Sequence, residues 1–264
     1  MKYEHKVSVV ITYYNKGRFL YNALGSLNKQ TINNFETILV NDCSNDRESQ
    51  MVWREISNSN FYQNKLVLYD LDKNYGASFA KNVGVRNASG DIIALLDADD
   101  VMPPTAIENI YEAFQKHRDA SVIFGNYSHN NQTVDCSILW KHNKIDIPTL
   151  LDNWILLGTS PFKKKAFEEI GGFNILYPNI DDTDFHMRLL MGKYVFKYIN
   201  QNIYTWIEHR NSNSKTVKRE DSAKLFFRNI DIYIHNYPIR KLFMRLLKNF
   251  LIIIISIFYK QKKL

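Results

Sequence analysis

Apolar runs and segments of helical periodicity alternate along the first hundred residues. Strand-like apolar runs lie at 7–11, 35–40, 65–69 and 91–96. Between them, apolar residues recur at helical spacing and predict helices over 19–27, 51–56 and 76–87. This alternation predicts a parallel sheet with helices on both faces.

The second half of the chain is less regular. Helices are expected over 107–114, 147–157, 164–170, 181–190 and 218–235. Strands are expected over 121–125, 195–199 and 203–207, with a hairpin or loop at 126–133. Gly171 and Gly172 should end the helix that begins at 164. The pattern predicts an α/β domain over residues 1–237 with a Rossmann-like, mainly parallel sheet.

Three carboxylates, Asp97, Asp99 and Asp100, follow directly on the apolar run 92–96. The carboxyl ends of parallel strands share one edge of a sheet, where ligands bind, so the loops 12–15, 41–46 and 97–100 should cluster there. Crowded carboxylates repel one another unless a divalent cation lies among them. In the alternative interpretation, Asp99 or Asp100 caps a helix that starts after Pro103 and Pro104.

Composition narrows the class of protein. An apolar fraction of 45% in 264 residues excludes a disordered chain. The net charge of +7 is carried by the seven basic residues after Pro238, so the body is formally neutral and no nucleic-acid-binding surface is expected. Residues 1–6 lead almost directly into a strand, and the chain has only two cysteines. We therefore expect no secretory signal and a cytoplasmic location.

Residues 238–264 combine this positive charge with the longest apolar run. The uninterrupted run from 250 to 259 is shorter than the roughly 20 residues that span a bilayer. We expect a basic amphipathic helix that lies on the inner face of the cell membrane. The alternative is a helix that forms a homodimer or packs on the body of the protein.

Four sequence blocks occur in an order that resembles the family 2 glycosyltransferases of the GT-A fold. They begin at Val7, Phe35, Asn74 and Gly171, and the third leads into the metal motif Asp97-Ala98-Asp99. The second block usually reads Asp-Asp-Gly-Ser, and here it reads Asn-Asp-Cys-Ser from Asn41. The fourth usually carries Glu-Asp, where this chain has Asp181 and Asp182.

The resemblance implies an inverting transfer from a nucleoside diphosphate sugar, with Mn²⁺ or Mg²⁺ as cofactor. It assigns residues 1–100 to donor binding and residues 101–237 to acceptor binding. The donor-binding positions that it implies are Thr12, Tyr14, Asn15, Asp42, Gly76, Lys81, Asp97 and Ala98. Among these, Tyr14 would lie near the base, Asp42 would accept a hydrogen bond from a uracil imide, and Lys81 would face the diphosphate.

The resemblance also implies the metal ligands and the base. Asp99 would bind the cation, and Asp97 would hold the ribose or a metal-bound water. His209 matches a histidine that some members use as a further metal ligand; alternatively it is a surface or capping residue. Asp182 would be the catalytic base with Asp181 beside it, although acids in the first turn of a helix are also favoured by the helix dipole.

The expected function is transfer of a sugar to a hydroxyl of a bacterial surface glycan, such as a lipopolysaccharide, lipooligosaccharide, O-antigen or capsule. Two alternatives remain. One is a nucleotidyl- or phosphotransferase, for which the sequence lacks a phosphate-binding glycine loop. The other is a catalytically silent partner of a membrane glycan assembly, which the presence of Asp99 and Asp182 disfavours.

Overall fold

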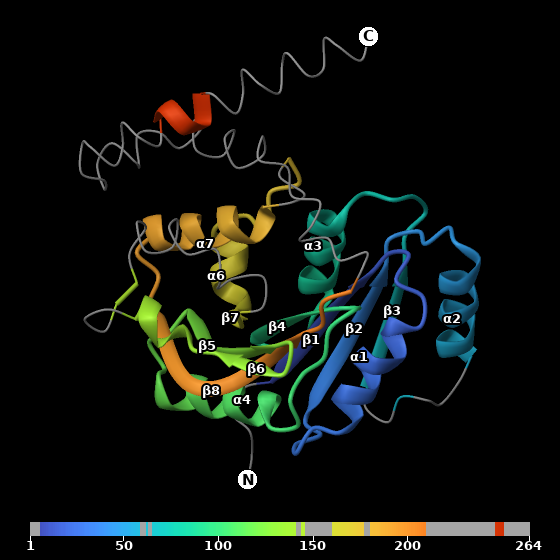
Figure 1. The fold of residues 1–264 in the computed structure, drawn as a ribbon, viewed down its shortest axis with the longest axis horizontal. Coiled ribbons are helices and arrows are strands. Elements are labelled where there is room, and N and C mark those ends of the chain that lie inside the picture. The colour runs from blue at the N-terminus through green and yellow to red at the C-terminus, as the bar shows by residue number, and fades with distance from the viewer. Residues whose placement is uncertain are drawn as a thin grey trace.

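The computed structural model describes residues 6–58, 62, 65–140, 144–145, 160–176, 180–209 and 246–250. Its strands form one eight-stranded sheet in the order β3-β2-β1-β4-β7-β5-β6, with β8 paired to β5 (Figure 1). The strands are β1 (Val7–Tyr13), β2 (Phe35–Asn41), β3 (Lys65–Asp70), β4 (Ile92–Asp97), β5 (Val122–His129), β6 (Gln132–Val134), β7 (Phe162–Lys163) and β8 (Phe196–Trp206).

The first four strands confirm the predicted parallel alternation. β1 pairs in parallel with both β2 and β4, and β2 pairs in parallel with β3. The strands that belong to the second half make the sheet mixed, because β7 is antiparallel to both β4 and β5. One continuous sheet therefore runs through both halves of the chain.

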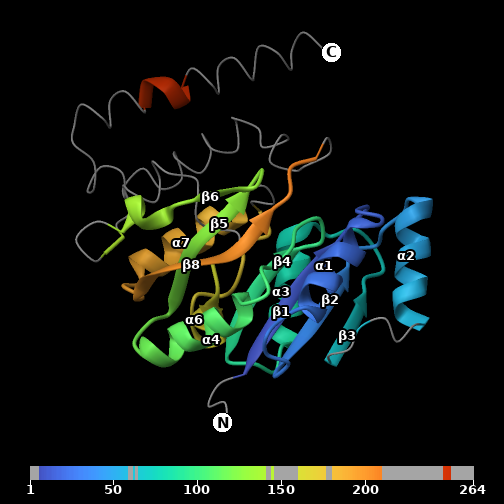
Figure 2. The same cartoon turned by 60° about the horizontal axis from the view of Figure 1, so that its bottom comes forward.

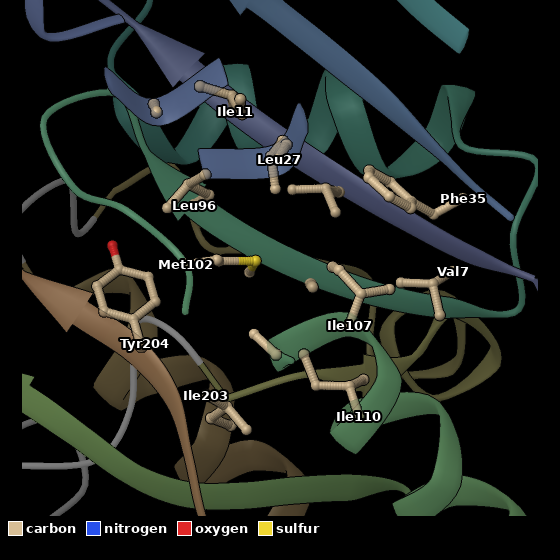
Figure 3. Packing of buried hydrophobic residues seen from close by; sticks show 14 of the residues in the cluster. Val7, Ile11, Leu27, Phe35, Leu96, Met102, Ile107, Ile110, Ile203 and Tyr204 are labelled. Carbon is tan, nitrogen blue, oxygen red and sulfur yellow. The ribbon is translucent and has the colours of Figure 1, made fainter. Parts of the chain in front are cut away.

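The helices cover both faces of this sheet and close two separate apolar cores. α3 (Ala77–Asn87), α6 (Lys164–Glu169) and α7 (Asp181–Met191) lie on one face, as Figure 1 shows. α1 (Phe19–Asn28), α2 (Arg47–Asn58) and α4 (Ala106–Lys116) contribute to the core on the other. There, side chains of β1, β4, α4 and β8 pack together (Figure 3). Burial of apolar residues on both faces explains why the central strands read as unbroken apolar runs.

Most predicted elements are confirmed with small shifts at their ends, and one is wrong. The two strands expected at 195–199 and 203–207 are a single strand, β8, which runs beside β5 (Figure 2). The polar residues between them stay within the strand because the register of the pairing with β5 shifts on both sides of Asn126. A Cβ at Gly125 would lie 2.7 Å from the carbonyl oxygen of Gln201, so glycine permits this close approach.

Two further details correct or confirm the sequence analysis. α4 begins at Ala106 with Thr105 in the N-cap position, so neither Asp99 nor Asp100 caps it and that alternative is wrong. The hairpin expected within 126–133 is present between β5 and β6, with Asn130 and Asn131 both at positive φ in its turn.

The predicted helices at 147–157 and 218–235 lie outside the described residues. So does most of the predicted tail 238–264, of which residues 246–250 are helical. Within the part of the chain that the structure describes, no helix is long and apolar enough to cross a bilayer.

Candidate active site

The loops that follow β1, β2 and β4 converge at one edge of the sheet, as predicted. Thr12 and Asp97 are partners across β1 and β4, and Tyr13 and Asn41 are partners across β1 and β2. Thr12 is half-buried, whereas Tyr14 is 39% exposed beyond the end of β1. These strand ends form one side of the candidate active site.

Asn15 fastens the loop after β1 to the loop after β2. Its backbone N–H donates to Ser44 Oγ over 3.1 Å, and its side-chain oxygen accepts from the backbone N–H of Asn45 over 2.9 Å. Its φ of 51° lies in the left-handed region, which asparagine tolerates better than most residues. The structure thus gives Asn15 a loop-shaping role, and both Asn15 and the neighbouring Tyr14 are exposed.

Asp42 anchors the turn that leads into α3. Its two carboxylate oxygens accept the backbone N–H groups of Tyr75 and Gly76, each over 2.8 Å, and the residue is only 2% exposed. Burial raises the pKa of Asp42, and these two hydrogen bonds oppose the rise. Gly76 is the N-cap of α3 with a φ of 93°, a conformation that favours glycine. Asp42 and Gly76 therefore shape the same turn.

The two departures from the family's second block have local explanations. Asn41 donates from Nδ2 to Asp70 Oδ1 over 2.8 Å, and its Oδ1 accepts from the backbone N–H of Ser44. An aspartate at position 41 would instead place two carboxylates against each other. Cys43 stands where the family usually has glycine, and it keeps the left-handed backbone with a φ of 58°. Both residues are therefore accommodated by the backbone of this loop.

A first cluster of charges joins the end of β4 to the start of α7. Lys81, on α3, donates to Asp181 Oδ2 over 2.8 Å, and both residues are buried. Burial alone would lower the pKa of Lys81, but the carboxylates of Asp181, Asp97 and Asp182 outweigh it and raise the pKa. Lys81 is thus a permanently charged group among three carboxylates.

Asp182 lies beside this ion pair and is half-buried. Burial raises its pKa to about 6, and the negative charge of Asp181 adds to the rise, while Lys81 and a hydrogen bond from the Thr183 N–H oppose it. His186 donates from Nδ1 to the carbonyl oxygen of Asp182 over 2.7 Å. A carboxyl group with a pKa near the working pH is suited to accept a proton.

The third acid of this helix start has a structural role. Asp184 accepts a hydrogen bond from Arg188 Nε over 2.7 Å and forms an ion pair with Nη2 of the same guanidinium, which also donates to the carbonyl oxygens of Ile170 and Gly172. The same turn is held from the other side by Asn82, which exchanges two 2.8 Å hydrogen bonds with the backbone of Phe173. The structural explanation therefore accounts for Asp184, and among the described residues it gives Asp182 no comparable arginine partner.

A second cluster surrounds Asp99. Its Oδ2 atom lies 2.5 Å from Lys16 Nζ and 2.7 Å from His209 Nε2. The His209 ring also stacks on Phe19, with ring centroids 4.4 Å apart. His209 therefore reaches the predicted metal ligand, whereas Ala98 is buried in the apolar core and offers only its backbone to the site.

The remaining acids of the β4 end differ from Asp99. Asp100 is buried and accepts from the Tyr204 hydroxyl over 2.6 Å and from the Ile207 N–H over 2.7 Å, so it ties the end of β8 to this loop. Burial and the nearby Asp97 raise the pKa of Asp100 to about 7. Asp97 is solvent-accessible although protein surrounds it closely enough to raise its pKa by desolvation.

The donor set fits a divalent cation bound mainly by one carboxylate and one imidazole. Asp99 and His209 already touch, and the exposed Asp97 is two residues away. Among the described residues no three acidic, histidine or cysteine side chains form a ready cluster. Cations of this kind take one or two carboxylates and complete their shell with water and substrate phosphates. The residues present match that pattern.

Sequence reasoning missed Lys16 and the structural role of Asp100. Lys16 follows Asn15 in the loop after β1, and its position in a loop expected to meet the acid cluster was the available signal. The partners of Asp100 lie at the end of β8 and directly after it, more than a hundred residues away, so no local sequence pattern predicts these contacts.

The fold, a mainly parallel sheet with acidic residues at its carboxyl edge, is that of a GT-A glycosyltransferase. The chain belongs to the family described as glycosyl transferase family 2, whose model matches residues 8–198. This assignment favours the predicted glycosyltransferase over the nucleotidyl- or phosphotransferase alternative. The chain is 29% identical to glycosyltransferase GlyG of Streptococcus pneumoniae serotype 4, over 80% of this chain and 73% of that protein.

Two solved structures share the fold. S. aureus TarS 1-349 in complex with UDP-GlcNAc matches with a TM-score of 0.69 and 22% identity, over 89% of this chain and 68% of that one. The mannosyltransferase PcManGT from Pyrobaculum calidifontis, in complex with GDP-Man and Mn²⁺, matches with a TM-score of 0.60 and 18% identity, over 94% of this chain and 69% of that one.

Proposed function

We propose that this glycosyltransferase moves a sugar from a UDP-sugar to an acceptor hydroxyl with inversion, and that Asp182 is the base. The observation that carries the proposal is the placement of Asp182 at the start of α7. It is half-buried beside the Lys81–Asp181 ion pair, which neighbours the β4 end where the donor would bind.

The chemistry needs one base on the acceptor side. The acceptor hydroxyl must lose its proton as it attacks the anomeric carbon, and a positioned carboxylate contributes roughly 10²–10⁴-fold to such a step. Asp181 is engaged in an ion pair with Lys81. Of the two adjacent aspartates, Asp182 is therefore the one suited to take the proton. A retaining double displacement would need a second carboxylate acting as a nucleophile.

The leaving diphosphate gathers negative charge at the β4 end. Asp99 and His209, with Asp97 nearby, would hold a divalent cation that stabilises this charge by several kcal/mol. Thr12 and Tyr14 lie at the adjacent strand end, where they would contact the nucleotide.

We predict that uridine is the preferred base of the donor. The UDP-GlcNAc complex of the structurally similar TarS supports this prediction. Asp42, directly after β2, is buried and already accepts two backbone N–H groups, so a uracil imide would add a third hydrogen bond to this carboxylate. Calorimetry with UDP, GDP and ADP in the presence of Mn²⁺ tests the prediction, followed by a panel of UDP-sugars assayed for hydrolysis. We expect UDP to bind at least about 10-fold more tightly than GDP, the equivalent of one hydrogen bond to a buried partner. Tighter binding of GDP would contradict the prediction.

The acceptor is proposed to be a bacterial surface glycan carried on a lipid, with residues 238–264 holding the enzyme at the inner face of the membrane. The basic residues of this segment and its apolar run support that proposal. The full chain should float with anionic liposomes and be released by salt, whereas a chain truncated before Pro238 should stay unbound. Equal flotation of both chains would contradict a membrane role for the segment.

A further inference from the structure

Lys16 contacts the candidate metal ligand Asp99, although the sequence did not single it out as a site residue. It lies in the loop between β1 and α1, directly after Asn15 and two residues after Tyr14. Its Nζ atom is 2.5 Å from Asp99 Oδ2, and the side chains of the two residues are only 14% and 12% exposed. The contact is thus a partly buried, charge-assisted hydrogen bond rather than a solvated surface pair.

The same oxygen of Asp99 also meets His209. Nε2 of His209 lies 2.7 Å from Oδ2, and that side chain is 14% exposed. A cation held by Asp99 and His209 would compete with the ammonium group of Lys16 for the same carboxylate. Two positive charges a few ångströms apart repel strongly in surroundings with little water.

We propose that Lys16 and a divalent cation bind Asp99 alternately. With no cation bound, Lys16 neutralises Asp99. When the cation binds, Lys16 leaves the carboxylate and pairs with the anionic group that arrives with the cation, the diphosphate of the donor. The inference rests on the proposed metal role of Asp99, and it makes Lys16 a donor-binding residue that also sets the affinity for the metal.

This exchange couples the metal to the nucleotide. Lysine carries its charge on a flexible four-carbon stem, so its ammonium group can move between two anionic partners without a change in the backbone. A cation alone must displace Lys16 with no new partner for the ammonium group, whereas a cation that arrives with a nucleoside diphosphate supplies one. The free enzyme should therefore bind Mn²⁺ weakly, and UDP should strengthen that binding.

The test is Lys16→Met, with Lys116→Met as the matched control. Lys116 is exposed in the last turn of α4, so its loss removes the same charge away from the site. Electron paramagnetic resonance titrations measure Mn²⁺ binding to each protein without nucleotide, and calorimetry then measures UDP binding at saturating Mn²⁺. Lys16→Arg serves as a second variant that keeps the charge.

We expect Lys16→Met to bind Mn²⁺ about 10-fold more tightly without nucleotide, the equivalent of one charge-assisted hydrogen bond, and to bind UDP more weakly by a similar factor. Lys116→Met should match the wild type in both titrations. Unchanged or weaker Mn²⁺ binding by Lys16→Met would overturn the alternation, and unchanged UDP binding would overturn the diphosphate contact. Asp99→Asn separates the two levels of inference. If that variant still binds Mn²⁺ normally, the proposed metal role fails; if it does not, a negative result with Lys16→Met refutes the inference about Lys16 alone.

Discussion

Replacement of Asp182 by asparagine is expected to lower the rate of sugar transfer by roughly 10²-fold or more while donor binding survives. Asparagine has nearly the same shape, and it keeps the oxygen that accepts from the Thr183 N–H. It cannot accept a proton from the acceptor. Calorimetric titration with UDP and a steady-state transfer assay on the same protein separate binding from chemistry.

The pH profile gives this prediction a second readout. Because the pKa of Asp182 is raised to about 6, the wild-type rate should increase as the pH rises through about 6 and then level off. The residual activity of Asp182→Asn should lack this limb. A wild-type profile that stays flat between pH 5 and 7 would contradict the assignment of the base.

The Asp182→Asn variant is not expected to lose stability at neutral pH. The pKa of Asp182 is higher in the folded protein than in the unfolded chain, so folding takes up a proton between the two values. The carboxyl group therefore favours folding least above pH 6, where it is ionised in both states. At pH 7 the Asp182→Asn variant should be at least as stable as the wild type, and loss of activity cannot then be assigned to unfolding.

Asp181→Asn is the matched variant for the neighbouring acid. It removes the partner of Lys81 and leaves a buried ammonium group without its ion pair, so it should cost stability as well as activity. If Asp181→Asn abolishes transfer in a folded protein while Asp182→Asn remains active, the two roles must be exchanged.

The sequence was sufficient for the parallel part of the fold because its evidence is local. Strands buried on both faces must be apolar throughout, and the helices between them must carry one apolar stripe, so both patterns are visible in a single chain. The convergence of Thr12 and Asp97 then follows from parallel topology. The sequence did not predict that β8 is one strand rather than two. Its polar middle is accommodated only by the irregular pairing with β5, which no local pattern shows.

The site was predictable to the extent that its residues follow strand ends. Asp97 and Asp99 could be singled out because they lie at the end of β4, whereas Asp182 lies at the start of α7 and was singled out only through the resemblance to the family's fourth block. The different roles of neighbouring acids could not be predicted. Asp100 and Asp184 differ from their neighbours only through Tyr204 and Arg188, contacts that depend on how distant elements pack. Two acids adjacent in sequence can therefore differ completely in role.

Asp99→Asn is the second substitution with a large expected effect. The asparagine side chain is nearly isosteric with aspartate, and its amide oxygen would still accept hydrogen bonds from Lys16 and His209, so the melting temperature should change by only a few degrees. It would lack the charge that attracts a divalent cation. We expect Mn²⁺-dependent turnover to fall by about 10²-fold or more and UDP binding in the presence of Mn²⁺ to weaken.

The control for Asp99→Asn is Asp91→Asn, which changes the same side chain just before the opposite end of β4. Electron paramagnetic resonance should show loss of bound Mn²⁺ in the first variant and unchanged binding in the second. Asp97 sharpens the comparison, because it is exposed at the same strand end and two residues from Asp99. If the Asp99→Asn variant keeps its Mn²⁺ dependence and Asp97→Asn loses it, the cation is bound by Asp97, and the contact between Asp99 and His209 is a structural link between the β4 end and the segment after β8.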